Sequence, residues 1–332
     1  MKAISLLSGG LDSILATKMM IDQGVEVEAL NFMTVFCNCT SGNKTCLASK
    51  SAADELGVPL KVMEVSQEYF EVIKNPKHGY GRNINPCLDC RIFMFHKTKE
   101  YMAESGASFV ITGEVLGSRP MSQRRRAIEI IEAESGLEGY IVRPLSARLF
   151  KPSIPEEKGW VDREKFMNIE GRSRKPQIQM AEDFGINDYP CPAGGCLLTD
   201  LGFANRMRDL MKRKPEFDTN DVKLLKSGRL FRISPEARLV SGRNESENKR
   251  LKNLLREGDI CFETIDVAGP TGVGRGLSTE EDIKKAASII ARYSDVEKEG
   301  EIDIAYKETG GDLSGTITVS SAYENELNMM RV

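Results

Sequence analysis

Short apolar runs alternate with longer amphipathic stretches through the first half of the chain. Brief apolar runs bounded by turn residues are typical of buried strands, whereas apolar positions three and four residues apart are typical of helices. The predicted strands are 3–7, 25–32, 60–65, 109–112 and 140–142, and the predicted helices are 14–23, 46–56, 91–105 and 121–134. This alternation predicts an α/β fold with a doubly wound parallel sheet, whose ligand crevice lies at the carboxyl ends of the strands.

The pattern changes after residue 150. Residues 151–175 have little periodicity and contain several Pro and Gly residues, and a helix is predicted over 177–184. We place a boundary near residue 200, which predicts domains 1–200 and 201–332. The second domain is expected to be a smaller α+β unit, with predicted helices 203–214 and 246–256 and predicted strands 229–233 and 237–241.

Composition places the chain among globular proteins, with 332 residues, 40% hydrophobic and 29% charged. We find neither an apolar run of about 18 residues nor a signal-peptide pattern at the N-terminus, so we expect a cytoplasmic protein with no membrane partner. In that compartment, the eight cysteines are expected to be thiols, metal ligands or catalytic groups rather than disulfides.

Charge is distributed unevenly along the second domain. Residues 203–256 carry fifteen Lys/Arg and seven Asp/Glu, whereas residues 257–332 carry seven Lys/Arg and sixteen Asp/Glu. A local basic surface of this kind indicates contact with a nucleic acid.

The first predicted strand runs into the hexapeptide Ser8-Gly9-Gly10-Leu11-Asp12-Ser13. Backbone N–H groups and a helix N-terminus then surround one small volume, which suits a phosphate group. Gly9 and Gly10 let the backbone approach the phosphates, Ser8 and Ser13 offer hydroxyls, and Asp12 can hold Mg²⁺. The alternative interpretation is an ordinary glycine turn between a strand and a helix.

This hexapeptide resembles the loop of the PP-loop ATP pyrophosphatases, which split ATP between the α and β phosphates and transfer AMP to an oxygen of the substrate. The resemblance implies a PP-loop fold of the adenine nucleotide alpha hydrolase type. It also implies ATP and Mg²⁺ as cofactors, with Asn31 and Phe32 beside the adenine.

Later motifs narrow the resemblance to one group. Taken together they resemble the tRNA 4-thiouridine synthetase family over about residues 1–200, and the related tRNA 2-thiouridylases share the layout. The motifs are Cys87-Leu88-Asp89-Cys90-Arg91, Thr112-Gly113-Glu114-Val115-Leu116-Gly117, Ser122-Gln123 and Val142-Arg143-Pro144-Leu145. The resemblance implies that Arg91, Gly113 and Gln123 contact the nucleotide and that the substrate is tRNA.

The spacing of the cysteines indicates a group of thiols that could bind a metal or carry sulfur. Cys87 and Cys90 form a Cys-x-x-Cys just before the helix predicted from Arg91, and Cys196 or Cys191 can supply a third thiol. We prefer Cys196, because Gly194 and Gly195 precede it and permit a close backbone approach. Some enzymes of this superfamily bind an iron–sulfur cluster with a Cys-x-x-Cys and one distant Cys. The resemblance therefore implies a cluster, [4Fe-4S], held by Cys87, Cys90 and Cys196.

Two other interpretations of these thiols stay open. One is a persulfide relay between Cys90 and Cys196 that depends on lowered thiol pKa values, which would make both residues catalytic together with Asp12. The other is a structural zinc site or buried thiols. A second metal site formed by Cys37, Cys39 and Cys46 is a further alternative, and Cys261 is predicted to be a core residue.

The second domain contains the motifs Phe231-Arg232-Ile233-Ser234-Pro235-Glu236-Ala237, Val240-Ser241-Gly242-Arg243-Asn244-Glu245, Asn248-Lys249-Arg250-Leu251 and Ala268-Gly269-Pro270-Thr271. Together these motifs resemble the NFACT-R type of RNA-binding domain. Six basic residues are candidates for contacts with tRNA phosphates, namely Arg229, Arg232, Arg238, Arg243, Lys249 and Arg250. Phosphate contacts would set affinity and register rather than base choice. The alternative is a dimerisation domain with a solvated basic surface, for which we would expect a homodimer.

The predicted function is ATP-dependent tRNA thiolation, in which a uridine carbonyl is adenylated and its oxygen is replaced by sulfur. We favour 4-thiouridine over 2-thiouridine as the product. No rhodanese-like sulfur carrier follows the loop domain, so we expect inorganic sulfide or a separate sulfur-donor protein to supply the sulfur. The competing hypotheses are an adenylating ligase or amidotransferase that uses nitrogen, and an RNA-binding protein with a degenerate nucleotide site.

Overall fold

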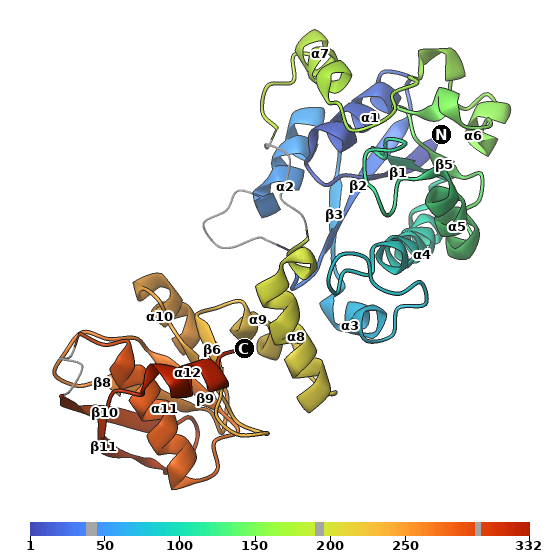
Figure 1. The fold of residues 1–332 in the computed structure, drawn as a ribbon. Helices are drawn as coiled ribbons and strands as arrows, with labels where there is room; N and C mark the ends of the chain where they lie inside the picture. The colour runs from blue at the N-terminus through green and yellow to red at the C-terminus, as the bar shows by residue number, and fades with distance from the viewer. Residues whose placement is uncertain (38–44, 190–195, 296–299) are drawn as a thin grey trace. The chain divides into compact units, whose positions relative to one another are not determined.

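The computed structural model describes residues 1–37, 45–189, 196–295 and 300–332, with the side chains of residues 45–47 left out. The chain divides into two compact units, residues 1–199 and 200–332 (Figure 1). No helix in these described ranges is long and apolar enough to cross a membrane.

The first unit contains a parallel five-stranded sheet in the order β3-β2-β1-β4-β5. Its strands are β1 (Lys2–Leu6), β2 (Glu26–Met33), β3 (Leu60–Glu64), β4 (Phe109–Thr112) and β5 (Ile141–Val142). Its α-helices are α1 (Leu11–Ile21), α2 (Thr45–Leu56), α3 (Ser66–Lys74), α4 (Cys87–Ser105), α5 (Arg125–Ser135), α6 (Ile154–Glu157) and α7 (Lys175–Asp183).

Hydrophobic cores cover both faces of this sheet. On β1, Ala3 packs in the core that includes residues of α1 and α7, whereas Ile4 packs in the core that includes residues of α4 and α5. Alternate residues of one strand thus enter opposite cores, as expected for a sheet with helices on both faces. The predicted doubly wound α/β class is confirmed.

Strand order reverses between β1 and β4, because the chain continues from β1 to β2 and β3 on one side and to β4 and β5 on the other. Ligands of doubly wound sheets bind at the carboxyl ends of the strands that flank such a switch point. Here those ends carry the Ser8–Ser13 loop and Gly113.

Three helix starts differ from the prediction by three or four residues. Helix α1 begins at Leu11 rather than Ile14, α4 begins at Cys87 rather than Arg91, and α5 begins at Arg125 rather than Met121. The segment 151–175 includes the short helix α6 and contributes Val161 and Phe166 to the core, so part of it has a packing role.

The second unit contains an antiparallel six-stranded sheet in the order β11-β10-β8-β9-β7-β6. Its strands are β6 (Arg229–Arg232), β7 (Arg238–Ser241), β8 (Ile260–Thr264), β9 (Gly272–Arg275), β10 (Glu301–Glu308) and β11 (Ser314–Ser320). Its α-helices are α8 (Leu201–Arg213), α9 (Thr219–Leu225), α10 (Glu245–Lys252), α11 (Glu280–Arg292) and α12 (Glu324–Met330).

Apolar residues of α11 pack with sheet residues in the core of this unit. The prediction for Cys261 is wrong. On β8, Ile260 and Phe262 are buried in that core, while Cys261 between them is only partly buried. Period-two alternation along the strand places Cys261 on the other face.

Candidate active site

A pocket of about 630 Å³ opens at the carboxyl ends of β1, β2 and β4. This volume lies within the usual range for small-molecule sites. The pocket brings together ten of the predicted site residues, namely Ser8, Ser13, Asn31, Phe32, Cys87, Cys90, Arg91, Gly113, Gln123 and Cys196. Gly9, Gly10 and Asp12 do not line it.

Hydroxyl groups close the loop between β1 and α1. The Oγ atoms of Ser8 and Ser13 are 3.1 Å apart, and the Gly10 N–H donates to the Oγ of Ser8 at 3.3 Å. Gly9 has a φ of +77°, and a Cβ there would lie 2.5 Å from the carbonyl carbon of Ala48. Only glycine therefore allows this backbone path, which sets Ser8 and Ser13 at the wall of the pocket.

Gly113 supports the same loop from β4. Its φ is not in the left-handed region, but a Cβ would lie 2.5 Å from the carbonyl group of Asp12 and from the nitrogen of Ser13. The chain after β4 therefore touches the first turn of α1 backbone to backbone. This close approach explains the glycine independently of any nucleotide contact.

Asp12 lies in the first turn of α1, with its side chain near Gln177 and Arg174 of the segment around α7. Burial raises the pKa of Asp12, and the nearby charge of Arg174 opposes that rise. The Oδ1 atom is buried and has no hydrogen-bond partner among the residues described. A carboxylate oxygen left in this way fits a ligand of Mg²⁺.

Glu114 is a functional candidate that the sequence analysis missed. Its side chain is buried and joins two arginines: the Nη2 of Arg91 lies 2.7 Å from Oε1, and the Nε of Arg143 lies 3.1 Å from Oε2. Burial by itself would raise the pKa of Glu114, but Arg91 and Arg143 lower it, so the carboxylate is ionised. Glu114 therefore fixes the position of Arg91, which lines the pocket.

We expect Glu114→Gln to raise the KM for ATP about tenfold, equivalent to ~1.4 kcal/mol, with a smaller change in kcat. The amide is neutral and no longer holds Arg91 in place as a charged partner. Steady-state kinetics with varied ATP measures the effect. Glu164→Gln is the matched control, because Glu164 forms an exposed ion pair with Arg148, and such pairs contribute little. An unchanged KM in the Glu114 variant would show that this ion pair does not position the nucleotide site.

Two of the pocket thiols belong to one helical turn. Cys87 and Cys90 are the first and fourth residues of α4, and their N–H groups donate to the carbonyls of Asn85 and Pro86 at 3.0 and 2.8 Å. The thiols therefore belong to the helix itself, whereas the sequence had predicted them in the segment just before it. Cys196 reaches the same pocket from the end of the unit, just before the turn 197–199.

Burial is the main influence on the pKa of the thiols on α4. It raises the pKa of the partly buried Cys87 and Cys90, whereas the side chain of Cys196 is exposed. The lowered pKa values assumed by the persulfide relay are therefore not found. Tyr69, a buried residue that the sequence analysis missed, hydrogen-bonds to Cys90 and opposes the rise there.

No set of three or more Cys, His, Asp or Glu side chains in the described ranges is arranged so that it could hold a metal ion. Of the cysteines in the proposed second metal site, Cys37 is partly buried and near Thr34, with its Sγ 3.4 Å from the Thr34 nitrogen. Cys39, the side chain of Cys46, and Cys191 lie outside the described residues.

Comparison with known proteins agrees with the loop and the motifs. Residues 1–151 match the family model described as thiamine biosynthesis protein (ThiI), and residues 228–331 match that of the NFACT protein RNA-binding domain. The fold, the loop and these matches make the first unit similar to the PP-loop ATP pyrophosphatases of the ThiI and tRNA 2-thiouridylase group, and they make residues 228–331 similar to NFACT-R domains. They confirm the resemblance seen in the sequence.

Curated relatives match over part of their length. The chain is 25% identical over 225 residues to the tRNA-specific 2-thiouridylase MnmA of Marinobacter nauticus, covering 63% of this chain and 53% of that protein. It is 32% identical over 127 residues to MnmA of Pseudothermotoga lettingae, covering 34% of this chain and 36% of that protein. The chain thus spans about half or less of these relatives.

Two solved structures are distantly similar. One is a 4-thiouridine synthetase–RNA complex with bound ATP, with 20% identity, a TM-score of 0.36 and coverage of 56% of this chain and 51% of that chain. The other is the U34-tRNA thiolase NcsA from Methanococcus maripaludis with its [4Fe-4S] cluster, with 16% identity, a TM-score of 0.34 and coverage of 68% and 71%. These scores are too low to support a functional argument.

Proposed function

We propose that this protein uses ATP to adenylate a carbonyl oxygen of a tRNA uridine and then replaces that oxygen with sulfur. One observation carries the proposal: a single pocket is lined by the hydroxyls of the Ser8–Ser13 loop, by Arg91 and by the thiols of Cys87, Cys90 and Cys196. An adenylating site and a sulfur site that share one pocket suit a reaction in which sulfur displaces AMP.

Each side of the pocket has a proposed part in the first step. The Ser8–Ser13 loop and the N-terminus of α1 bind the phosphates, while Asn31 and Phe32 lie beside the base. Asp12, whose Oδ1 is buried without a partner in the described chain, holds Mg²⁺. Arg91, Gly113 and Gln123 contact the nucleotide, and the charge of Arg91 stabilises the phosphate oxygens in the transition state.

The atoms balance in two steps. The uridine oxygen attacks the α-phosphorus of ATP, an O–P bond forms, and pyrophosphate leaves. A sulfur nucleophile then attacks the uracil carbon that carries this oxygen, and a C–S bond forms. The C–O bond breaks, and AMP leaves with the former carbonyl oxygen. The sulfur comes from inorganic sulfide or a sulfur-donor protein.

For the sulfur step, we propose that Cys87, Cys90 and Cys196 hold a [4Fe-4S] cluster. Three thiols on one pocket provide the right donor type, although the described side chains are not arranged as a finished ligand set. When bound, such a cluster would supply activation of sulfide. The thiols favour sulfur transfer over the alternative of an adenylating ligase or amidotransferase, which would not need them. Anaerobic purification followed by iron and sulfide analysis tests the cluster.

The product is proposed to be 4-thiouridine, with 2-thiouridine as the alternative suggested by the curated relatives. The test is anaerobic incubation of the protein with tRNA, ATP and sulfide. AMP and pyrophosphate are expected to form only when tRNA is present. Formation that instead requires a small acid and an amine would point to the ligase alternative.

A further inference from the structure

The second unit contains a pocket of its own, of about 330 Å³. Its lining carries six Lys/Arg side chains and three Asp/Glu side chains, and three carboxylates outside the lining, those of Asp209, Asp218 and Asp221, pair with these cations. The cationic residues are Arg213, Lys214, Arg232, Arg238, Arg256 and Arg275. Two of the three acidic residues, Glu236 and Glu257, are exposed, whereas Asp259 is buried.

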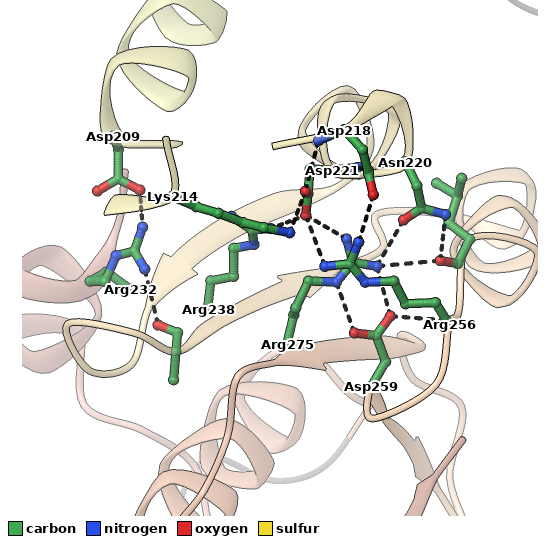
Figure 2. Close-up of polar contacts among 12 residues, drawn as sticks. Asp209, Lys214, Asp218, Asn220, Asp221, Arg232, Arg238, Arg256, Asp259 and Arg275 are labelled. Atoms are coloured by element: carbon green, nitrogen blue, oxygen red, sulfur yellow. Dashed lines mark hydrogen bonds and ion pairs between the residues drawn. The ribbon is translucent and has the colours of Figure 1, made fainter. Parts of the chain in front are cut away.

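A buried carboxylate behind this wall holds the cations in place. Asp221 is fully buried and is not among the lining residues. It pairs with Lys214 at 2.6 Å and with the Nη1 of Arg275 at 2.8 Å, and it also pairs with Arg238 and Arg256 (Figure 2). Four cations share one carboxylate, so their charge is not fully neutralised by it.

Further contacts orient individual arginines. Asp259 accepts two hydrogen bonds from Arg275, at 2.8 and 2.7 Å, Asp209 pairs with Arg232, and Asp218 pairs with Arg256 at 3.0 Å (Figure 2). Within the described part of the chain, the buried Nε atoms of Arg232 and Arg238 have no acceptor. Two guanidinium N–H donors at the pocket are therefore left without an acceptor among the described residues, although carboxylates already fix most of its cations.

Arg213 differs from the other lining cations. It is the last residue of α8, it is exposed, and it forms no ion pair with any described residue. Its guanidinium is therefore available to an anion at the pocket, whereas Arg238 is buried. The sequence had predicted that Arg238 contacts tRNA phosphates from a basic surface. In the structure Arg238 is buried and lies in the wall of this pocket.

We propose that this pocket binds a phosphate group of an RNA strand. Several guanidinium groups fixed around one recess match the shape and charge of a phosphate. None of the described lining residues is aromatic, so the pocket recognises the phosphate rather than a stacked base. Four of the six cations lie within residues 228–331, which match an RNA-binding family model. The proposal rests on the proposed function, because that function makes RNA the substrate.

The test compares Arg213→Ala with Lys212→Ala in the full chain. Lys212 is also exposed and lies next in sequence, but it does not line the pocket, so both variants remove one charge from the same helix end. Binding of a labelled tRNA is measured by fluorescence anisotropy without ATP over a range of KCl concentrations. Arg213→Ala is expected to weaken binding about fivefold to tenfold and to reduce the salt slope by about one, and Lys212→Ala is expected to weaken it less than about twofold.

Two further binding measurements test whether the pocket binds phosphate and which phosphate of the RNA it binds. Inorganic phosphate is expected to compete with RNA for the unchanged chain at constant ionic strength, and to compete less for Arg213→Ala. RNAs of one sequence with and without a 5′-phosphate distinguish an internal phosphate from the terminal one. If Arg213→Ala weakens the binding of both RNAs, the pocket binds an internal phosphate. If it weakens the binding of the phosphorylated RNA alone, the pocket binds the terminal phosphate.

Equal affinities and equal salt slopes for Arg213→Ala and the unchanged chain would overturn the phosphate pocket and leave the proposed function intact. No binding of tRNA by the unchanged chain would count against both. The two failures are therefore distinguishable in one experiment.

Discussion

Cys90→Ser is expected to reduce tRNA thiolation by about three orders of magnitude, the scale seen when a group that takes part in the chemistry is removed. Serine offers a hydroxyl in place of the thiol, which neither carries sulfur nor binds iron as a thiolate does. A single-turnover burst of pyrophosphate is expected to remain, because the Ser8–Ser13 loop is unchanged. Quenched-flow measurement of pyrophosphate and mass spectrometry of tRNA nucleosides read the two steps separately.

Cys261→Ser is the control, because Cys261 is partly buried in the second unit and lies outside the pocket. It should thiolate at the parent rate and keep the parent iron content, while Cys90→Ser loses iron. Parent-level thiolation by Cys90→Ser would remove this cysteine from the sulfur step.

The second large effect concerns Asp221. We expect Asp221→Asn to lower the free energy of unfolding of the second unit by about 3–5 kcal/mol, because removing one partner leaves buried charges uncompensated. The variant also loses the charge in the capping box of α9, where the Oδ2 of Asp221 accepts the N–H of Asp218 at 3.1 Å. Urea denaturation at pH 7 measures the change, and Glu245→Gln, which removes an exposed pair with Lys249, should change it by less than about 1 kcal/mol.

The effect should depend on pH in a defined direction. Burial opposes ionisation of Asp221, but hydrogen bonding by Lys214 and the charge of Arg238 lower its pKa well below the ordinary value near 4. Its stabilising contribution is therefore complete above about pH 4 and is lost as the pH falls through the lowered pKa. The difference between the parent chain and Asp221→Asn should shrink on acidification, and a difference that grows instead would contradict this assignment.

The sequence predicted the parallel sheet and most of the pocket because both depend on local patterns. Apolar periodicity identified the five strands of the first unit, and the Ser8–Ser13 loop follows directly from the first of them. Helix starts were less predictable. The first turn of a helix makes few intrahelical bonds through its N–H groups, so its residues resemble the preceding loop. Leu11 was assigned to the Ser8–Ser13 loop although it is buried with Ile14, and Cys87 was assigned to the segment before α4.

Residues whose partners come from distant segments were not predictable in this way. Glu114 follows the apolar strand β4, but its partners Arg91 and Arg143 lie 23 and 29 residues away. Asp221 and Arg275 are 54 residues apart. A charged residue two positions after a fully buried strand was the one local signal for Glu114, and nothing local distinguishes Asp221 from an ordinary residue of a helix capping box.

Mass spectrometry of tRNA nucleosides tests the central claim most directly. The protein is purified without oxygen and incubated with unmodified tRNA, sulfide and ATP, and a parallel sample lacks ATP. We predict a thiolated uridine only in the sample with ATP, in amounts equal to the AMP formed, and its chromatographic retention will distinguish 4-thiouridine from 2-thiouridine. AMP formation with intact cofactors but no thiolated nucleoside would contradict the proposed function.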